Sequence, residues 1–235
     1  MSEALLTAEN LSRQYTGGGV PVHALRAASF TIAPAECIIV LGPSGSGKST
    51  LLNIIGGMDT PTTGRLCYGG RDVSAFSARE LTEYRRDAVG FIFQFFNLIP
   101  SLTALENVAL AAAITAGAMS PPEALALVGL AERGAHFPSQ LSGGEQQRVS
   151  IARAIVKNPA LFLCDEPTGA LDTQNSATVV RLLLQMRDRL GCPVVIITHN
   201  TEIARAGDRI FHMKDGLLEK ISINSAPVPV EDLQW

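Results

Sequence analysis

Paired cysteines, an excess of basic residues and long apolar runs are all missing from this sequence, and each absence argues against a class of protein. The four cysteines are widely spaced and form no CxxC pair. This spacing argues against a disulfide scaffold and against a cysteine-based zinc site. Cys37 and Cys164 lie inside apolar runs, so we expect reduced thiols in the core of a cytoplasmic protein.

The charge balance gives no indication of a nucleic-acid binder. The 19 Lys and Arg residues are outnumbered by 22 Asp and Glu residues, which gives a formal net charge of −3. The longest apolar stretch, residues 108–119, is too short to span a bilayer. Residues 1–5 lack the positive and apolar blocks of a signal peptide, so we expect no leader.

Short, continuous apolar runs alternate with helical patterns along the chain. The runs Cys37–Leu41, Ala160–Cys164 and Val194–Thr198 predict strands that are buried on both faces of a parallel sheet. A helix is predicted from Lys48 to the glycine pair at 56–57. The alternation predicts an α/β fold with a mostly parallel central sheet.

Residues 95–139 differ in composition, being rich in alanine and leucine and punctuated by proline. We interpret this stretch as a small helical subdomain inserted into an α/β core made of residues 1–94 and 140–225. These parts together are expected to form one domain over residues 1–225. We expect residues 226–235 to form an extended, poorly ordered tail.

A glycine-rich loop lies between the first predicted buried strand and the helix that follows it. Residues 42–49 match the pattern GxxxxGK[ST], whose curled backbone points N–H groups at a phosphate. We predict that Lys48 binds the β- and γ-phosphates, that Ser49 coordinates Mg²⁺ and that Thr50 contacts the α-phosphate. The rest of the predicted cradle is Gly42, Pro43, Ser44, Gly45, Ser46 and Gly47. The alternative, a glycine-rich turn beside a surface lysine, does not explain the flanking strand and helix.

Three polar residues follow predicted strands, at the strand ends where α/β folds place ligands. We expect Asp165 to hold the Mg²⁺ and Glu166 to act on the attacking water, as a general base or as an orienting group. His199 follows the run Val194–Thr198 and is assigned to the γ-phosphate. Taken singly, an acidic turn or a structural histidine would account for these residues. Their order behind the glycine loop favours a catalytic role for Lys48, Glu166 and His199.

A second glycine-rich segment, Leu141-Ser142-Gly143-Gly144-Glu145, lies far along the chain from the first and opens a helical pattern. It predicts a second anion-binding helix terminus. A plain helix cap followed by a flexible glycine pair is the alternative. A second site of this kind would be redundant in a single-site nucleotidase, so we infer that two copies of the chain complete each other's sites.

Over nearly its whole length the sequence resembles the nucleotide-binding domain of ATP-binding-cassette (ABC) transporters. The segment 141–148 is similar to the specific signature of that family. The resemblance implies a P-loop NTPase core with an antiparallel β subdomain and an inserted α-helical subdomain. It also implies an ATPase that uses ATP and Mg²⁺ and forms an ATP-dependent homodimer.

Several residue roles are implied by the resemblance. Contacts to the γ-phosphate held by the opposite subunit are implied for Ser142, Gly143, Gly144 and Glu145. Gln94 would sense the Mg²⁺ or the lytic water and would join the core to the helical subdomain. Asp172 would lie in a loop that crosses the dimer interface. Tyr15 would lie against adenine, although a tyrosine at a strand end is more often a packing residue.

Stretches between the motifs, namely 22–26, 53–59, 93–98 and 165–172, are similar to the macrolide-exporter and lipoprotein-releasing branch of the family. That branch implies a membrane permease as partner, with peripheral association at the inner face of the plasma membrane. It also implies conformational work across the bilayer. The segment 112–138 departs from the branch because it is several residues shorter.

Two questions remain open at the level of the sequence. Four apolar residues either line a docking groove for the permease or pack in the core, and these are Phe91, Phe95, Phe96 and Leu98. The chain could instead be a regulatory ATPase of a cell-division or cell-wall-hydrolase-controlling permease. A soluble ABC ATPase of DNA repair or translation is disfavoured, because the sequence has one cassette, no metal-binding insertion and no basic stripe.

Overall fold

A single ten-stranded sheet runs through the computed structural model, which describes residues 4–16 and 19–234. The expectation of no leader concerns residues 1–5, of which residues 1–3 lie outside the described residues. The strand order is β5-β4-β1-β2-β10-β9-β3-β8-β7-β6. The strands are β1 Leu6–Tyr15, β2 Val22–Ile32, β3 Cys37–Leu41, β4 Thr63–Tyr68, β5 Arg71–Asp72, β6 Val89–Phe93, β7 Leu161–Asp165, β8 Val194–Thr198, β9 Arg209–Lys214 and β10 Leu217–Ile223.

The sheet has a parallel half and an antiparallel half. Strand β3 pairs in parallel with β9 and β8, and β7 pairs in parallel with β8 and β6. On the other side, β1 pairs antiparallel with both β2 and β4, and β10 joins β9 antiparallel. The predicted α/β fold, with its mostly parallel central sheet and antiparallel β subdomain, is confirmed.

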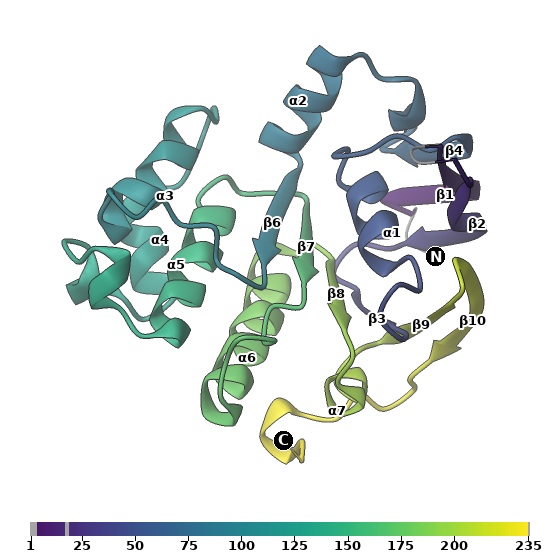
Figure 1. Cartoon of the computed structure of the whole chain (residues 1–235). Helices are drawn as coiled ribbons and strands as arrows, with labels where there is room; N and C mark the ends of the chain where they lie inside the picture. The colour runs from purple at the N-terminus through teal and green to yellow at the C-terminus, as the bar shows by residue number, and fades with distance from the viewer. Residues whose placement is uncertain (1–3, 17–18, 235) are drawn as a thin grey trace.

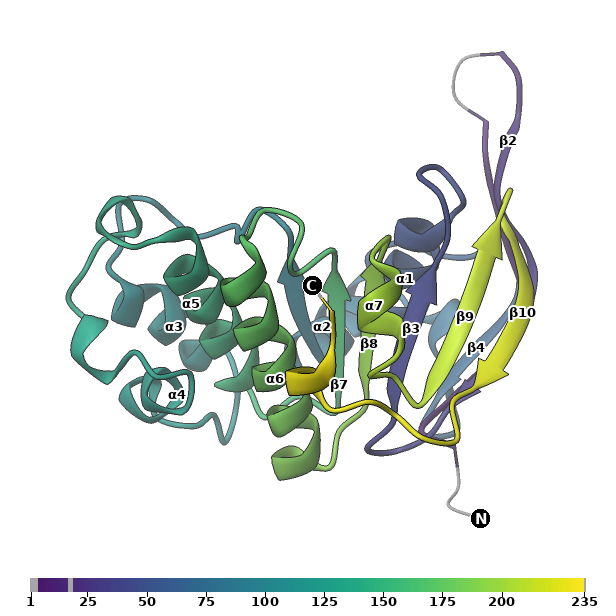
Figure 2. The ribbon, with the colours of Figure 1, turned by 90° about the horizontal axis from the view of Figure 1, so that it is seen from below.

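Helices cover both faces of the parallel strands (Figures 1 and 2). The helices are α1 Lys48–Ile55, α2 Ala78–Asp87, α3 Ala104–Ala113, α4 Pro121–Leu127, α5 Gly143–Ile155, α6 Thr173–Leu190 and α7 Thr201–Ala204. Short 3₁₀ turns cover Val73–Ala75, Ala131–Arg133, Pro138–Gln140 and Val230–Asp232.

Two apolar cores lie on opposite faces of the parallel strands. On β3, Ile38 and Val40 belong to the core that contains α1, whereas Cys37 and Ile39 belong to the core that contains α5 and α6. Successive side chains on a strand point to opposite faces, so a strand buried on both faces has no polar positions. This is why the core strands are continuous apolar runs in the sequence.

The helices α3 and α4 stand apart from the sheet and pack against α5 (Figures 1 and 2). Thr103 and Glu106 form a capping box that starts α3, and Ser120 caps α4. The buried side chain of Asn107 holds the preceding loop, because its Nδ2 donates to the carbonyl oxygens of Ile99 and Leu102. Helix α5, whose N-cap is Ser142, joins this cluster to the core, because Gln147 Nε2 donates to the Pro167 carbonyl oxygen in the segment after β7.

The thiols expected from the sequence are present in reduced form. All four cysteines are free, and burial raises the pKa of the Cys37 thiol to about 12, so that thiol stays protonated.

The sequence predicts an extended tail, but Val230 and Leu233 are buried in the core that contains α6. Glu231 adds an ion pair to Arg181 on α6, with an Oε1–Nε distance of 2.6 Å. None of the described helices is long and apolar enough to cross a membrane.

Candidate active site

The register of the parallel strands brings four predicted site residues to one edge of the sheet. In that register Leu41 lies beside Thr198, and Asp165 lies beside both Ile197 and Phe93. The carboxyl ends of β3, β8, β7 and β6 are therefore nearly level. The residues that follow these ends are Gly42, His199, Glu166 and Gln94.

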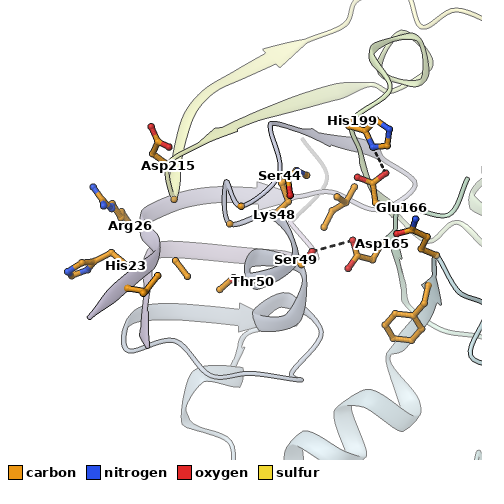
Figure 3. A pocket seen from close by; sticks show the side chains of 18 of the residues that line it. His23, Arg26, Ser44, Lys48, Ser49, Thr50, Asp165, Glu166, His199 and Asp215 are labelled. Carbon is orange, nitrogen blue, oxygen red and sulfur yellow. Dashed lines mark hydrogen bonds and ion pairs between the residues drawn. The ribbon is translucent and has the colours of Figure 1, made fainter. Parts of the chain in front are cut away.

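A cleft of about 1140 Å³ opens at this edge (Figure 3). A cleft of this size can hold a nucleotide, because typical small-molecule pockets measure about 300–1,000 Å³. Of the residues predicted from the sequence, its lining includes Ser44, Gly45, Gly47, Lys48, Ser49, Thr50, Gln94, Asp165, Glu166 and His199. Gly42, Pro43 and Ser46 lie in the same loop without lining the cleft.

The glycine loop turns directly into helix α1. Gly45 and Gly47 have φ values of 76° and 96°, which glycine adopts more readily than other residues. A Cβ atom at Gly47 would also collide with the Ala24 carbonyl oxygen on β2. Gly47 has no side chain to cap α1, so the first N–H groups of the helix are free to bind an anion.

Lys48 is the first residue of α1 and is almost fully buried. Its Nζ donates hydrogen bonds to the carbonyl oxygens of Gly42 and Pro43, at 2.8 and 2.9 Å. The ammonium group therefore lies over the loop, where an ammonium and a ring of backbone N–H groups can share one phosphate chain.

Ser49 and Asp165 supply two oxygen atoms to the floor of the cleft. The Ser49 hydroxyl donates to Asp165 Oδ1 at 3.4 Å (Figure 3). Burial raises the pKa of Asp165, the Glu166 charge raises it further, and the Ser49 hydrogen bond opposes the shift. Among the described residues, no group of three or more His, Cys, Asp or Glu side chains could hold a metal by itself. Mg²⁺ fits this donor set, because it takes few protein ligands and completes its shell with phosphate oxygens and water.

Glu166 and His199 form a close pair at the mouth of the cleft. Glu166 Oε2 and His199 Nδ1 are 3.0 Å apart, and the glutamate side chain is 18% exposed against 75% for the histidine. Glu166 has a φ of 48°, a left-handed conformation that costs energy for a residue other than glycine. Its backbone N–H donates to the Ile197 carbonyl oxygen, which fixes this conformation to strand β8. Strain of this kind is typical of functional sites.

Gln94 lies at the carboxyl end of β6, with its side chain against the loop after β7. A Cβ atom at Gly169 would lie 2.8 Å from Gln94 Nε2. A larger residue at position 169 would therefore push the Gln94 amide out of this position. The amide of Gln94 is thus held between the cleft and the segment that carries Glu166.

The second glycine-rich segment lies outside the cleft of its own chain. Ser142 caps α5 in a capping box, in which its Oγ accepts from Glu145 N and Glu145 Oε2 accepts from Ser142 N. Glu145 also pairs with Arg133, at an Oε1–Nε distance of 3.2 Å. Gly144 packs against Asn175, whose N–H donates to the Asp172 side chain that caps α6. Residues 142–145 and Asp172 therefore cluster together, away from Lys48.

Tyr15 lies in β1 and does not line the cleft. Its hydroxyl donates to Asp59 Oδ2 at 2.7 Å, and the guanidinium of Arg13 lies 4.7 Å from the centroid of its ring. The residue remains 39% exposed. Its predicted contact with adenine stays a prediction.

Some lining residues are not among the site residues predicted from the sequence. Val22, His23 and Arg26 on β2 form one wall of the cleft, and Asp215 in the turn between β9 and β10 lies at its rim (Figure 3). The backbone links these elements to the glycine loop, because Gly216 N donates to the Ser46 carbonyl oxygen at 3.1 Å. These side chains lie in the cleft only because β2 and β10 are neighbours in the sheet, which no local motif encodes.

Comparison with known proteins identifies the class to which this fold and cleft belong. Residues 25–169 match the family model described as "ABC transporter". An ABC transporter ATP-binding protein of Methanocaldococcus jannaschii, MJ0796, is 44% identical over 225 residues, which cover 92% of this chain and 96% of the relative.

Solved structures show the same architecture. A dimeric post-hydrolysis structure of the MJ0796 cassette, bound to ADP and Pi, superimposes with a TM-score of 0.86 at 41% identity, covering 94% of this chain and 99% of that one. CbiO1 from Clostridium perfringens, part of the ABC transporter complex cbiONQ, gives a TM-score of 0.83 at 27% identity, covering 95% and 90% of the two chains. The fold is that of a P-loop NTPase. The chain belongs to the ATP-binding cassettes of the ABC transporter family and is an ATPase.

Proposed function

We propose that this chain hydrolyses MgATP at two composite sites of a homodimer and thereby drives a membrane permease. The observation that carries the dimer is the separation of two anion-binding helix termini in one chain. Lys48 lines the cleft, whereas Ser142 starts α5 outside it. A second copy could place its Ser142 opposite the Lys48 of the first. The MJ0796 cassette, which has been solved as a dimer, supports this arrangement.

Different residues of the cleft bind different parts of MgATP. The loop N–H groups and Lys48 hold the phosphate chain, and Thr50 lies beside the α-phosphate position. Ser49 and Asp165 would hold Mg²⁺, with Gln94 near it. When bound, Mg²⁺ neutralises charge on the β- and γ-phosphate oxygens.

Hydrolysis requires an oriented water and a place for its proton. Glu166 accepts the proton as the water oxygen attacks the γ-phosphorus and the bond to the β-γ bridging oxygen breaks. His199 Nδ1 lies 3.0 Å from Glu166 Oε2 and would hold the carboxylate in place, and it is proposed to contact the γ-phosphate. The products are ADP and phosphate. Catalysis by this arrangement consists mostly of positioning and charge stabilisation.

Complementation between two inactive variants tests the shared site. Lys48→Ala damages the loop half of each site, and Ser142→Arg blocks the signature half. Each variant alone should be inactive, whereas a mixture should regain turnover because mixed dimers contain one site with both halves intact. Mixing Lys48→Ala with Lys48→Ala/Ser142→Arg is the matched control and should stay inactive. Absence of rescue at every mixing ratio contradicts the composite site.

Docking of the permease is supported by apolar side chains on the helical subdomain. Phe95 is 74% exposed, Ile114 is 63% exposed and Leu110 is 48% exposed. Of the four residues left open by the sequence, Phe91 and Leu98 pack against the two cores, and Phe95 is the exposed one. Leu110 and Ile114 lie one helical turn apart at the end of α3 and so share one face of it. Exposed apolar side chains grouped in this way are typical of protein interfaces.

The permease is proposed to be of the macrolide-export or lipoprotein-release type, with this chain at its cytoplasmic face. CbiO1, a part of a transporter complex, supports the assembly of such cassettes with other subunits. In vesicles that contain a purified permease of this type, added permease should stimulate ATP turnover. Leu110→Ser and Ile114→Ser should lose this stimulation and keep basal turnover. Stimulation that survives both substitutions removes this surface from the docking site.

A further inference from the structure

Arg153 of α5 reaches across to the loop that follows β6. Its Nη2 donates to the Phe96 carbonyl oxygen at 2.8 Å, and its Nη1 donates to the Asn97 carbonyl oxygen. The side chain is half-buried, and burial lowers its pKa. These are the hydrogen bonds of one guanidinium fork to two successive carbonyl groups. An ammonium group has no such fork, so lysine could not reproduce both bonds with the same geometry.

The loop that Arg153 holds has an unfavourable backbone conformation. Phe96 and Asn97 have φ values of 59° and 51°, so two successive residues other than glycine are left-handed. The left-handed region is costly for a bulky residue such as Phe96, and such a conformation persists only when its surroundings fix it. Gln94 lies just before this turn and lines the cleft. The direction of the Gln94 side chain therefore depends on a strained turn, and Arg153 contributes two hydrogen bonds to that turn.

A second cation, just past the end of α5, contacts the other end of β6. Lys157, two residues beyond Ile155, donates from Nζ to the carbonyl oxygens of Arg85 and Val89, at 2.9 and 2.6 Å. Strand β6 begins at Val89 and Gln94 directly follows its end. Helix α5 is thus fastened to the start of β6 and to the turn beyond its end. The N-cap of this helix is Ser142.

We propose that Arg153 is a positioning residue for Gln94. Through the Phe96–Asn97 turn, it holds Gln94 in the cleft and fixes Gln94 relative to the helix that carries Ser142. A displacement of either element is therefore passed to the other. The proposal rests on the proposed function, because it assumes that Gln94 acts in hydrolysis.

The alternative is that Arg153 only satisfies two carbonyl groups and stabilises the fold. A double-mutant cycle between Arg153→Ala and Gln94→Ala separates the two roles. If Arg153 acts through Gln94, Arg153→Ala should lower kcat by about 10- to 100-fold, the scale of a misplaced catalytic group. KM for ATP should stay within about twofold, because the loop at Lys48 is untouched. In the Gln94→Ala background the same substitution should have no further effect on kcat.

Three results would overturn the proposal: wild-type kcat in Arg153→Ala, wild-type kcat in Gln94→Ala, and losses that multiply in the double variant. If Arg153→Ala fails to fold, Arg153→Lys takes its place in the cycle, with a smaller loss expected. Arg79→Ala is the control and should keep wild-type turnover, because the Arg79 side chain is 89% exposed on α2 and pairs only with Glu83 among the described residues. The turnover of the wild-type chain in the same assay tests the proposed function separately.

Discussion

Replacing Glu166 with glutamine keeps the size of the side chain and removes one negative charge from each cleft. Both residues tolerate the same rotamers, and the backbone bond from residue 166 to Ile197 does not involve the side chain. The glutamine cannot accept the proton of the attacking water. A general base contributes about 10²- to 10⁴-fold to a rate, so kcat should fall by this factor, equivalent to about 3–5 kcal/mol.

Binding of nucleotide should survive the same substitution. The charge of Glu166 helps to raise the pKa of Asp165, so its removal favours the ionised carboxylate of Asp165. One fewer negative charge also faces the γ-phosphate in each composite site. Glu166→Gln should therefore bind MgATP at least as well as the wild-type chain and accumulate as an ATP-bound dimer.

The assays are single-turnover hydrolysis, equilibrium binding of MgATP, and size exclusion with light scattering in the presence and absence of MgATP. Glu231→Gln is the matched control, because Glu231 lies in the C-terminal segment and pairs with Arg181. Hydrolysis by Glu166→Gln near the wild-type rate would falsify the role of Glu166. A variant that binds MgATP but stays monomeric contradicts the shared site.

Three further predictions test the other parts of the site and of the fold. Lys48→Ala should raise the Kd for ATP by about tenfold or more in a binding titration, since a charge-assisted hydrogen bond to phosphate is lost. An unchanged Kd contradicts the assignment of Lys48 to the phosphate chain. Gly144→Ala should keep ATP binding but lose dimerisation in light scattering, because its Cβ would overlap Asn175 and displace the start of α5. Burial lowers the pKa of Lys157 from 10.5 to about 8. The unfolded state then binds more protons between these two values, so the free energy of unfolding should rise with pH across this window relative to Lys157→Met. A pH-independent difference between the two proteins in denaturant titrations contradicts this.

The parallel half of the fold could be predicted because its signals are local. The runs Cys37–Leu41 and Val194–Thr198 coincide with β3 and β8, and the helix from Lys48 ends at Ile55 as expected. A strand buried on both faces has to be apolar throughout, and a glycine loop between strand and helix marks the ends of both. The sequence therefore places the glycine loop and the predicted catalytic residues at strand ends.

The features that could not be predicted depend on long-range contacts, which leave no local pattern in the sequence. The hydrogen bond between Arg153 and Asn97 spans 56 residues. The tail residues Val230 and Leu233 are buried only because α6 and α7 leave an apolar surface beside them. His23 on β2 reaches the cleft through strand pairing. The roles of the predicted site residues, including Tyr15 and Asp172, remain predictions for mutagenesis.

The alignment of the strand ends has an entropic consequence. Gln94, Glu166 and His199 are each joined to neighbouring strands of one hydrogen-bonded sheet, so their relative positions are already ordered before any ligand binds. Little conformational entropy should be lost when a nucleotide enters the cleft of a single chain. Ser142 lies outside the cleft, at the start of α5, so this entropy is lost in the later step that brings two chains together. Substitutions in the loop at Lys48 should therefore act first on the binding of nucleotide, and substitutions at Ser142 on the association of the two chains.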